Sequence, residues 1–203
     1  MTDGLLFYWF SWLLWIYFTF VMKKRKERTV YAFWVLLILC GASVYITILG
    51  YKIMLSYLFL AFGAMVMLAK SKHLFYHLFC SLTIMVLYMA IMLWENYFPL
   101  WMMLSKTFIS PLIIVFIALI IMSKGFYSKV SIILLGISSG ELMNSFIMSS
   151  YAMKELIGGY VFFDSVLIIL FLLIGFEIVY ALKVKIRSVF LIYKKSFRVL
   201  REE

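Results

Sequence analysis

Long apolar runs separated by short charged segments restrict what this chain can fold into. Seven such runs cover residues 5–22, 30–49, 53–69, 74–94, 107–122, 130–151 and 161–182. About 20 apolar residues are needed for a helix to cross a hydrocarbon core about 30 Å thick. Peptide groups in hydrocarbon must bond internally, so only helices and closed barrels span a membrane. Barrel strands would alternate apolar and polar residues over about ten positions, and these runs do not. The sequence therefore predicts an all-α integral membrane bundle of about seven transmembrane helices.

Composition agrees with this fold class. Apolar residues make up 67% of the 203 positions and charged residues 14%. A water-soluble fold of this composition would have too little polar surface to cover itself. Residues 1–4 carry no basic side chain, whereas a secretory signal peptide begins with one. The first run is therefore expected to be a retained helix.

The positions of the basic residues predict the orientation. Of the 19 Lys and Arg residues, all except Lys52, Lys106 and Lys154 fall on one side of the membrane if the seven helices alternate. Cytoplasmic segments carry the excess of Lys and Arg, so the N-terminus is predicted outside and the C-terminus in the cytoplasm. Aromatic residues favour the headgroup level, and those of the first run crowd its outer half: Phe7, Tyr8, Trp9, Phe10, Trp12 and Trp15. The net charge of +10 thus belongs to helix ends, and no nucleic-acid partner is predicted.

Residues 183–203 are predicted to form a basic cytoplasmic tail that follows a transmembrane domain of residues 1–182. On a helix, its basic residues would gather on one side and its apolar residues on the other. The basic side comprises Lys183, Arg187, Lys194, Arg198 and Arg201, and the apolar side comprises Ile186, Val189, Phe190, Tyr193, Phe197 and Leu200. Such a helix is expected to lie on the inner leaflet, where anionic lipid attracts each basic residue by about 1 kcal/mol. A protein partner could use the same apolar face.

A carboxylate near the middle of the sixth run is the main candidate for function. A charged Glu141 inside a membrane must face the protein interior, find a partner or stay protonated. At helical spacing it shares a polar stripe with four serines, namely Ser131, Ser138, Ser145 and Ser149. Two interpretations remain open. Glu141 could be a proton or cation site lined by serine hydroxyls, or a protonated structural residue that fixes helix packing.

A second stripe on the same run contains Gly136, Gly140 and Asn144 at four-residue steps. Small residues four apart let another helix approach closely. Gly136 and Gly140 are therefore predicted to be helix-packing residues.

Two further acids lie in the seventh run. Asp164 and Glu177 are separated by about 20 Å along a helix, so they cannot act as a close pair. Residues 98–105 could extend the fifth helix or lie in the interface. If the fifth helix begins near Pro99, Lys106 would lie at a depth similar to that of Asp164. A neutralising Lys106–Asp164 pair is a hypothesis from this placement.

The few metal-capable and redox-capable residues give weak signals. His73, His77 and Cys80 would share one helix face, but nothing completes a ligand set, so no metal site is predicted. Cys40 and Cys80 both fall inside predicted spans and are expected to be packing residues.

Enzyme motifs are missing from the sequence. There is no zinc-protease His-Glu-x-x-His, no Gly-x-Ser-x-Gly elbow, no phosphate-binding loop and no haem-attachment motif. The last run lacks an interior lysine that could hold retinal. The sequence therefore favours a protein that is not an enzyme and needs no cofactor.

Several motifs resemble the YphA-like family of small, uncharacterised bacterial inner-membrane proteins. They are the aromatic opening at residues 7–12, the basic run at 23–28, the loop at 95–101 and the Gly-Glu-Leu-Met segment at 140–143. The resemblance covers most of the chain and implies a multi-pass location in the plasma membrane, with no activity to transfer.

Three function classes remain open at this point. The first is a membrane component that packs with itself or with another membrane protein. The second is a small transporter or channel that uses Glu141, and the third is a lipid-modifying enzyme. The first is favoured, because transporters usually contain an internal repeat or broken helices and headgroup enzymes need clustered polar residues.

Overall fold

A computed structural model describes most of the chain. The backbone is described for residues 4–23, 26–48, 50–71, 73–97, 106–121, 125–151 and 156–199. Within these ranges, side chains are described except at residues 26–27, 95–97, 106–109, 120–121 and 188–199. The chain divides into two compact units, Met1–Ile169 and Leu170–Glu203.

Helices make up most of the described chain, which agrees with the predicted fold class. They are α1 (Leu5–Ile16) with a π-helical turn at Tyr17–Val21, α2 (Lys26–Gly41), α3 (Leu55–Ala69), α4 (Leu74–Tyr97), α5 (Lys106–Ile121), α6 (Phe126–Ser150) and α7 (Tyr160–Val199). Pro111 lies inside α5. Residues 98–105, for which an extension of this helix and an interfacial segment were both left open, lie outside the described residues.

A β-hairpin corrects the prediction that the fold is all-α. Strands β1 (Tyr45–Ile48) and β2 (Tyr51–Met54) pair antiparallel, and Gly50 supplies a positive φ of 84° between them. Residue Ile157 extends this small sheet on the β2 side. Its N–H donates to the Lys52 carbonyl oxygen at 3.0 Å, and its own carbonyl oxygen accepts from the Met54 N–H at 3.1 Å.

The predicted second span, residues 30–49, is therefore wrong at its C-terminal end. Helix α2 ends at Gly41, where an added Cβ would lie 2.8 Å from the backbone nitrogen of Ser56. The chain turns back at this close approach, and the β-branched and aromatic residues that follow favour a strand. The third helix correspondingly begins at Leu55, two residues later than predicted.

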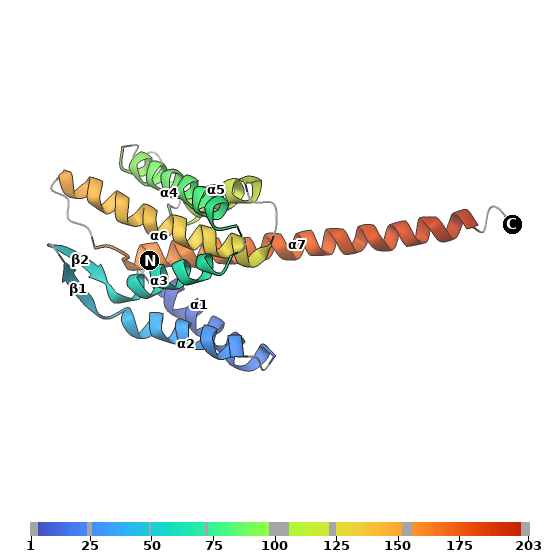
Figure 1. The fold of residues 1–203 in the computed structure, drawn as a ribbon, viewed down its shortest axis with the longest axis horizontal. Coiled ribbons are helices and arrows are strands. Elements are labelled where there is room, and N and C mark those ends of the chain that lie inside the picture. Colours follow the sequence, from blue (N-terminus) through green and yellow to red (C-terminus); the bar gives the residue numbers. More distant parts are fainter. Residues whose placement is uncertain are drawn as a thin grey trace. The chain divides into compact units, whose positions relative to one another are not determined.

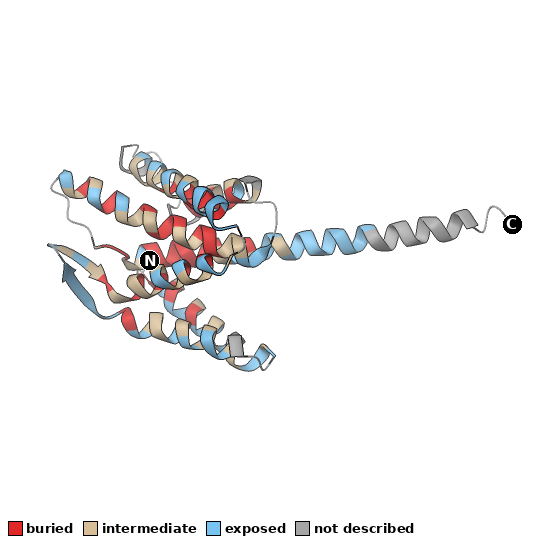
Figure 2. Ribbon diagram, in the orientation of Figure 1, coloured by how far each residue is buried: buried red, intermediate tan, exposed pale blue. Residues whose placement is uncertain are grey.

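Within the first unit, the helices pack side by side, in an order that differs from their order along the chain (Figure 1). Helix α6 lies between α3 and α4, α2 packs on the other side of α3, α1 packs on α2, and α5 packs on α4. Buried residues concentrate on α6 and on the facing sides of its neighbours (Figure 2). Every residue from 162 to 169, at the start of α7, is also buried. The core thus surrounds α6.

Three described helices are long and apolar enough to cross a membrane. These candidate spans are Leu74–Trp94, Phe126–Ser150 and Tyr160–Arg187. Shorter apolar helices occupy Leu5–Val21, Arg28–Gly41, Leu55–Ala69 and Ser110–Leu119. A helix of about 15 residues rises only about 22 Å, which is shorter than a typical hydrocarbon core. A helical protein with several candidate membrane spans is therefore shown.

Candidate functional site

Close contact between α6 and α4 is made possible by the two glycines of the predicted small-residue stripe. A Cβ added at Gly136 would lie 2.7 Å from Cβ of Ile84 and 2.9 Å from the Ser81 carbonyl oxygen. A Cβ at Gly140 would lie 2.8 Å from the Tyr88 ring. Real Cβ atoms do not approach other atoms this closely, so both positions need glycine. Because α4 of the same chain covers this face, a partner protein would have to use another surface.

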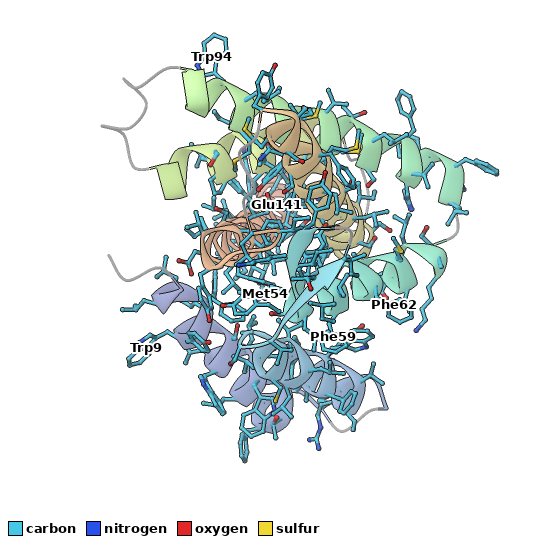
Figure 3. All side chains as sticks on the ribbon, turned by 90° about the vertical axis from the view of Figure 1, so that its left-hand side faces the viewer. Trp9, Met54, Phe59, Phe62, Trp94 and Glu141 are labelled. Carbon is cyan, nitrogen blue, oxygen red and sulfur yellow. The ribbon has the colours of Figure 1, made fainter. Side chains whose placement is uncertain are left out.

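Glu141 accepts a hydrogen bond from a tyrosine of α4. The Tyr88 hydroxyl donates to Oε2 of Glu141 at 2.7 Å. Only 1% of the Tyr88 side chain is exposed, and Glu141 is half-buried. Figure 3 shows Glu141 near the middle of the view, while Trp9 and Trp94 lie at its rim. The Glu141 carboxyl group is thus bound by the neutral hydroxyl of Tyr88.

A second tyrosine binds α6 from the opposite neighbour. The Tyr57 hydroxyl of α3 donates to the Ser138 carbonyl oxygen, and Tyr57 is buried with 1% exposed. Its ring also packs against Phe162 of α7, with centroids 5.6 Å apart. Helix α6 is therefore fixed on two sides by phenol groups.

The serines of the predicted stripe do not all line a shared site. The hydroxyls of Ser131 and Ser138 donate to carbonyl oxygens of their own helix, at Ser128 and Leu135. Ser145 is buried. Ser149 accepts from the Tyr51 hydroxyl at 2.9 Å, which ties the end of α6 to the hairpin. Two of the serines thus direct their hydrogens back into α6 and not toward a ligand.

Asn144 is a buried polar residue close to Glu141. Its side chain is 6% exposed, and its Oδ1 has no hydrogen-bond partner in the described part of the chain. The two residues are three positions apart on α6, which makes them neighbours on the helix surface. An amide oxygen without a donor therefore lies beside the carboxyl group.

Asp164 closes the N-terminal end of α1. Its carboxylate accepts from the Gly4 N–H at 3.1 Å and from the Phe7 N–H at 2.7 Å. These are amides that a helix leaves unpaired at its start, where the helix dipole also favours a negative charge. Asp164 itself is 8% exposed. The side chain of Lys106 lies outside the described residues, so the Lys106–Asp164 pair stays a hypothesis.

Comparison with known proteins identifies the family. A family model described as "YphA-like integral membrane protein" matches residues 3–198. The chain belongs to this family. A relative from Bacillus subtilis (strain 168), "Uncharacterized protein YphA", is 24% identical over 155 residues, which cover 76% of this chain and 77% of the relative. No solved structure matches the chain.

Membership in the YphA-like family makes the chain an integral membrane protein. The matched range covers helices α1 to α6 and all of α7 except its last residue. It supports the resemblance inferred from the aromatic opening and the segment at 140–143. The family description assigns no activity, so the chemistry of this member has to be argued from its own residues.

The remaining predicted residues are described unit by unit. Glu177 is half-buried in the second unit, where Lys183 and Arg187 are exposed. Side chains of Lys194 and Arg198, and the whole of Arg201, lie outside the described residues. His77 and Cys80 are buried and His73 is exposed, and the described residues hold no cluster of three metal-capable side chains. Cys40 is exposed on α2, so packing is not its role within this chain.

Tyr88 and Tyr57 are the site residues that sequence reasoning missed. Tyrosines in membrane proteins concentrate at the interfaces, whereas these two lie inside predicted apolar runs. A phenol in the middle of a span needs a hydrogen-bond partner. That requirement could have paired Tyr88 with Glu141, the carboxylate near the middle of the sixth run.

Proposed function

We propose that this YphA-like protein is a non-enzymatic component of the bacterial plasma membrane that packs with a second copy of itself or with another membrane protein. The observation that carries the proposal is the use of the polar groups on α6. Tyr88 binds Glu141, and Tyr57 binds the Ser138 backbone. These contacts hold helices of the same chain together. Glu141, the main candidate for function in the sequence, therefore has a structural role in them.

The surface available to a partner is apolar. Exposed large side chains occur on α1, α4 and α5 and include Trp12, Phe79 and Phe116, at 51%, 69% and 61% exposed. In a bilayer such side chains contact either lipid or another helix. Association of membrane helices rests on packing and on weak polar contacts, so these faces are compatible with a partner helix.

Photo-crosslinking from these faces tests the proposal. A photoreactive residue at Trp12, Phe79 or Phe116 should give crosslinks to a second copy or to one other membrane protein after mild detergent extraction, read by mass spectrometry. The matched control is Ile84, which is fully buried and should crosslink only within the chain. Lipid adducts alone at all three exposed positions would contradict the proposal.

The proposed threading has seven crossings, with the N-terminus outside and the C-terminus in the cytoplasm. The distribution of basic residues supports it, because nearly all of them collect on one side. The short helices α1, α2, α3 and α5 would cross with flanking residues or with local thinning of the bilayer. The hairpin carries Lys52 and would lie outside.

Single-cysteine labelling tests this threading. In a chain with Cys40 and Cys80 replaced by alanine, a membrane-impermeant maleimide added to intact cells should label the Thr47→Cys variant. The Arg187→Cys variant should react only after the cells are permeabilised. Both positions are exposed, so permeabilised cells serve as the control for reactivity. The reverse pattern would invert the threading.

The basic tail is proposed to contact anionic lipid at the inner leaflet. Lys183 and Arg187 are exposed, and both carry charge that anionic headgroups attract. Helix α7 continues without a break through Lys183, so a tail that lies flat on the leaflet would bend there. Labelling of the Arg187→Cys variant from outside intact cells would also exclude this proposal.

Transport through Glu141 is the second candidate function. The observation that favours it is the half-buried Glu141 next to Asn144, whose Oδ1 has no hydrogen-bond partner among the described residues. Glu141→Gln should abolish a pH-dependent flux if the chain is a transporter, and should leave flux unchanged if it is only a packing component.

A further inference from the structure

One edge of the β-hairpin is covered and the other is open. On the outer edge of β2, backbone groups of Lys52 and Met54 bond to Ile157 at 3.0 and 3.1 Å. All four residues of β1 are exposed, as Figure 2 shows. Among the residues that the structure describes, no strand or loop pairs with the outer edge of β1. An open edge of this kind is a template for pairing with another chain.

The register of the hairpin determines which backbone groups of β1 point outward. In an antiparallel pair, every second residue bonds to the partner strand and the residues between them point away from it. The Val44 carbonyl oxygen accepts from the Leu55 N–H at 2.9 Å, so it faces β2. The alternation then turns the backbone groups of Ile46 toward β2 and those of Tyr45 and Thr47 outward. On β2, the same rule turns outward the two residues named above, which agrees with their bonds.

The outward groups of β1 are complementary to those of a second copy. If two β1 strands pair antiparallel with Tyr45 opposite Thr47 of the other copy, each such pair of residues exchanges two hydrogen bonds. Every outward N–H and C=O group of both strands then has a partner. Ile46 lies opposite its own counterpart, at a position where side chains approach most closely. A register shifted by two residues would leave part of these groups unpaired, because one of the two residues would face a position outside β1.

The side chains of β1 also suit pairing with an identical strand. Residues 45–48 are aromatic or β-branched, and opposite pairs of such residues stabilise a sheet. None of the four is charged, so two copies would meet without like-charge repulsion along the edge. Exposed edges of natural sheets are commonly protected by Lys or Pro, and β1 contains neither. The lysine of the hairpin, Lys52, lies instead on β2, whose edge is already covered.

We propose that the outer edge of β1 pairs with the same edge of a second copy, with Tyr45 opposite Thr47 and Ile46 beside the two-fold axis. The two hairpins then form one continuous antiparallel sheet. This inference rests on the proposed packing role, and it gives that role one surface and one partner. An extended segment of a different protein is the other occupant that such an edge could take, and the test below distinguishes the two.

Disulfide trapping tests the register. In a full chain with Cys40 and Cys80 replaced by alanine, Ile46→Cys should give a disulfide-linked dimer when native membranes are treated with copper phenanthroline. Ile48→Cys, which is also exposed, is the matched control and should stay monomeric. At about 3.3 Å per residue, its two copies would lie about 13 Å apart along the strands. Co-expression of Ile48→Cys with Val44→Cys, the position opposite it in this register, should restore the crosslink.

Thr47→Pro separates backbone pairing from chance contact. Proline has no N–H and is tolerated at an edge position whose N–H points outward, so the hairpin should stay folded. In the Ile46→Cys chain it removes one hydrogen-bond donor from each strand and should lower the dimer yield about tenfold. Thr47→Val keeps the backbone N–H and the β-branched shape, so it should leave the yield unchanged. Size-exclusion chromatography and thermal unfolding check that each variant is folded.

Four results would overturn the proposal. Equal dimer yields from Ile46→Cys and Ile48→Cys would indicate contact without a fixed register. A crosslink from Ile46→Cys to a different protein would assign the edge to that protein. An unchanged yield in a folded Thr47→Pro variant would exclude backbone pairing. The last is a lack of dimer both from Ile46→Cys and from the Val44→Cys and Ile48→Cys pair.

This inference and the packing proposal can fail separately. If photo-crosslinking from the helix faces captures a second copy and Ile46→Cys does not, the pairing of β1 is wrong and the packing role stands. If Ile46→Cys dimerises in register while the helix faces give only lipid adducts, the packing of those faces is wrong and the pairing of β1 stands.

Discussion

Replacing Gly140 by leucine should sharply lower the stability of the isolated chain in detergent. Cβ at this position would lie 2.8 Å from the Tyr88 ring and 3.1 Å from the backbone oxygen of Met85. The backbone contact cannot be relieved by a side-chain rotation, so α4 itself would have to move. Overpacking of this kind costs about 1–3 kcal/mol and sometimes more. The shift would also break the bond between Tyr88 and Glu141, and thermal unfolding followed by size-exclusion chromatography measures the loss.

Gly175→Leu provides the matched control for this variant. An added Cβ at Gly175 meets nothing within 4 Å, so the same substitution in another apolar helix should leave the unfolding temperature nearly unchanged. Gly140→Ala should fall between the two, because it adds only the first carbon. If Gly140→Leu instead left the monomer as stable as Gly175→Leu and removed only an oligomer, the glycine face would be a contact between chains and the arrangement of α4 and α6 would be wrong.

Periodicity along one helix was enough to predict which residues of α6 share a face. The positions of Glu141, Gly136 and Gly140 follow from the sequence of a single segment, since residues three or four apart share a face. The partners do not follow in this way. Tyr88 is 53 residues from Glu141, and Tyr57 is 81 residues from Ser138. Which helix covers which face depends on tertiary packing. It could not be predicted from the sequence, because the apolar runs are similar in composition.

The β-hairpin was not predicted from the sequence, for a different reason. Residues 44–54 are nearly all apolar, aromatic or β-branched, and such a run is compatible with a buried strand or with part of a helix. The prediction from hydropathy therefore placed the end of the second helix at residue 49. Gly50 was the available signal for a turn, and the close approach of Gly41 to Ser56 could be seen only in three dimensions.

Asp164→Ala should be the second strongly destabilising substitution. Alanine would leave the Gly4 and Phe7 amides, which Asp164 binds at 3.1 and 2.7 Å, buried without an acceptor. Each unsatisfied buried donor costs about 1–3 kcal/mol, and the favourable charge at the helix N-terminus is lost as well. Helix α1 should fray from its start. Faster chymotrypsin cleavage within its aromatic segment and a lower unfolding temperature measure this effect.

Two matched variants separate the capping role of Asp164 from a general loss of polar contacts at the start of α7. Asp164→Asn keeps one acceptor oxygen, so its loss of stability should be smaller than that of Asp164→Ala. Ser165→Ala removes a hydroxyl that donates to the Val161 carbonyl of its own helix, and its effect should be slight. If Lys106→Ala were as destabilising as Asp164→Ala and the two effects failed to add, an ion pair would be the dominant contact. Additive effects, together with cleavage in α1 that responds only to Asp164, would instead identify the carboxylate as the cap of a helix that begins some 160 residues earlier in the chain.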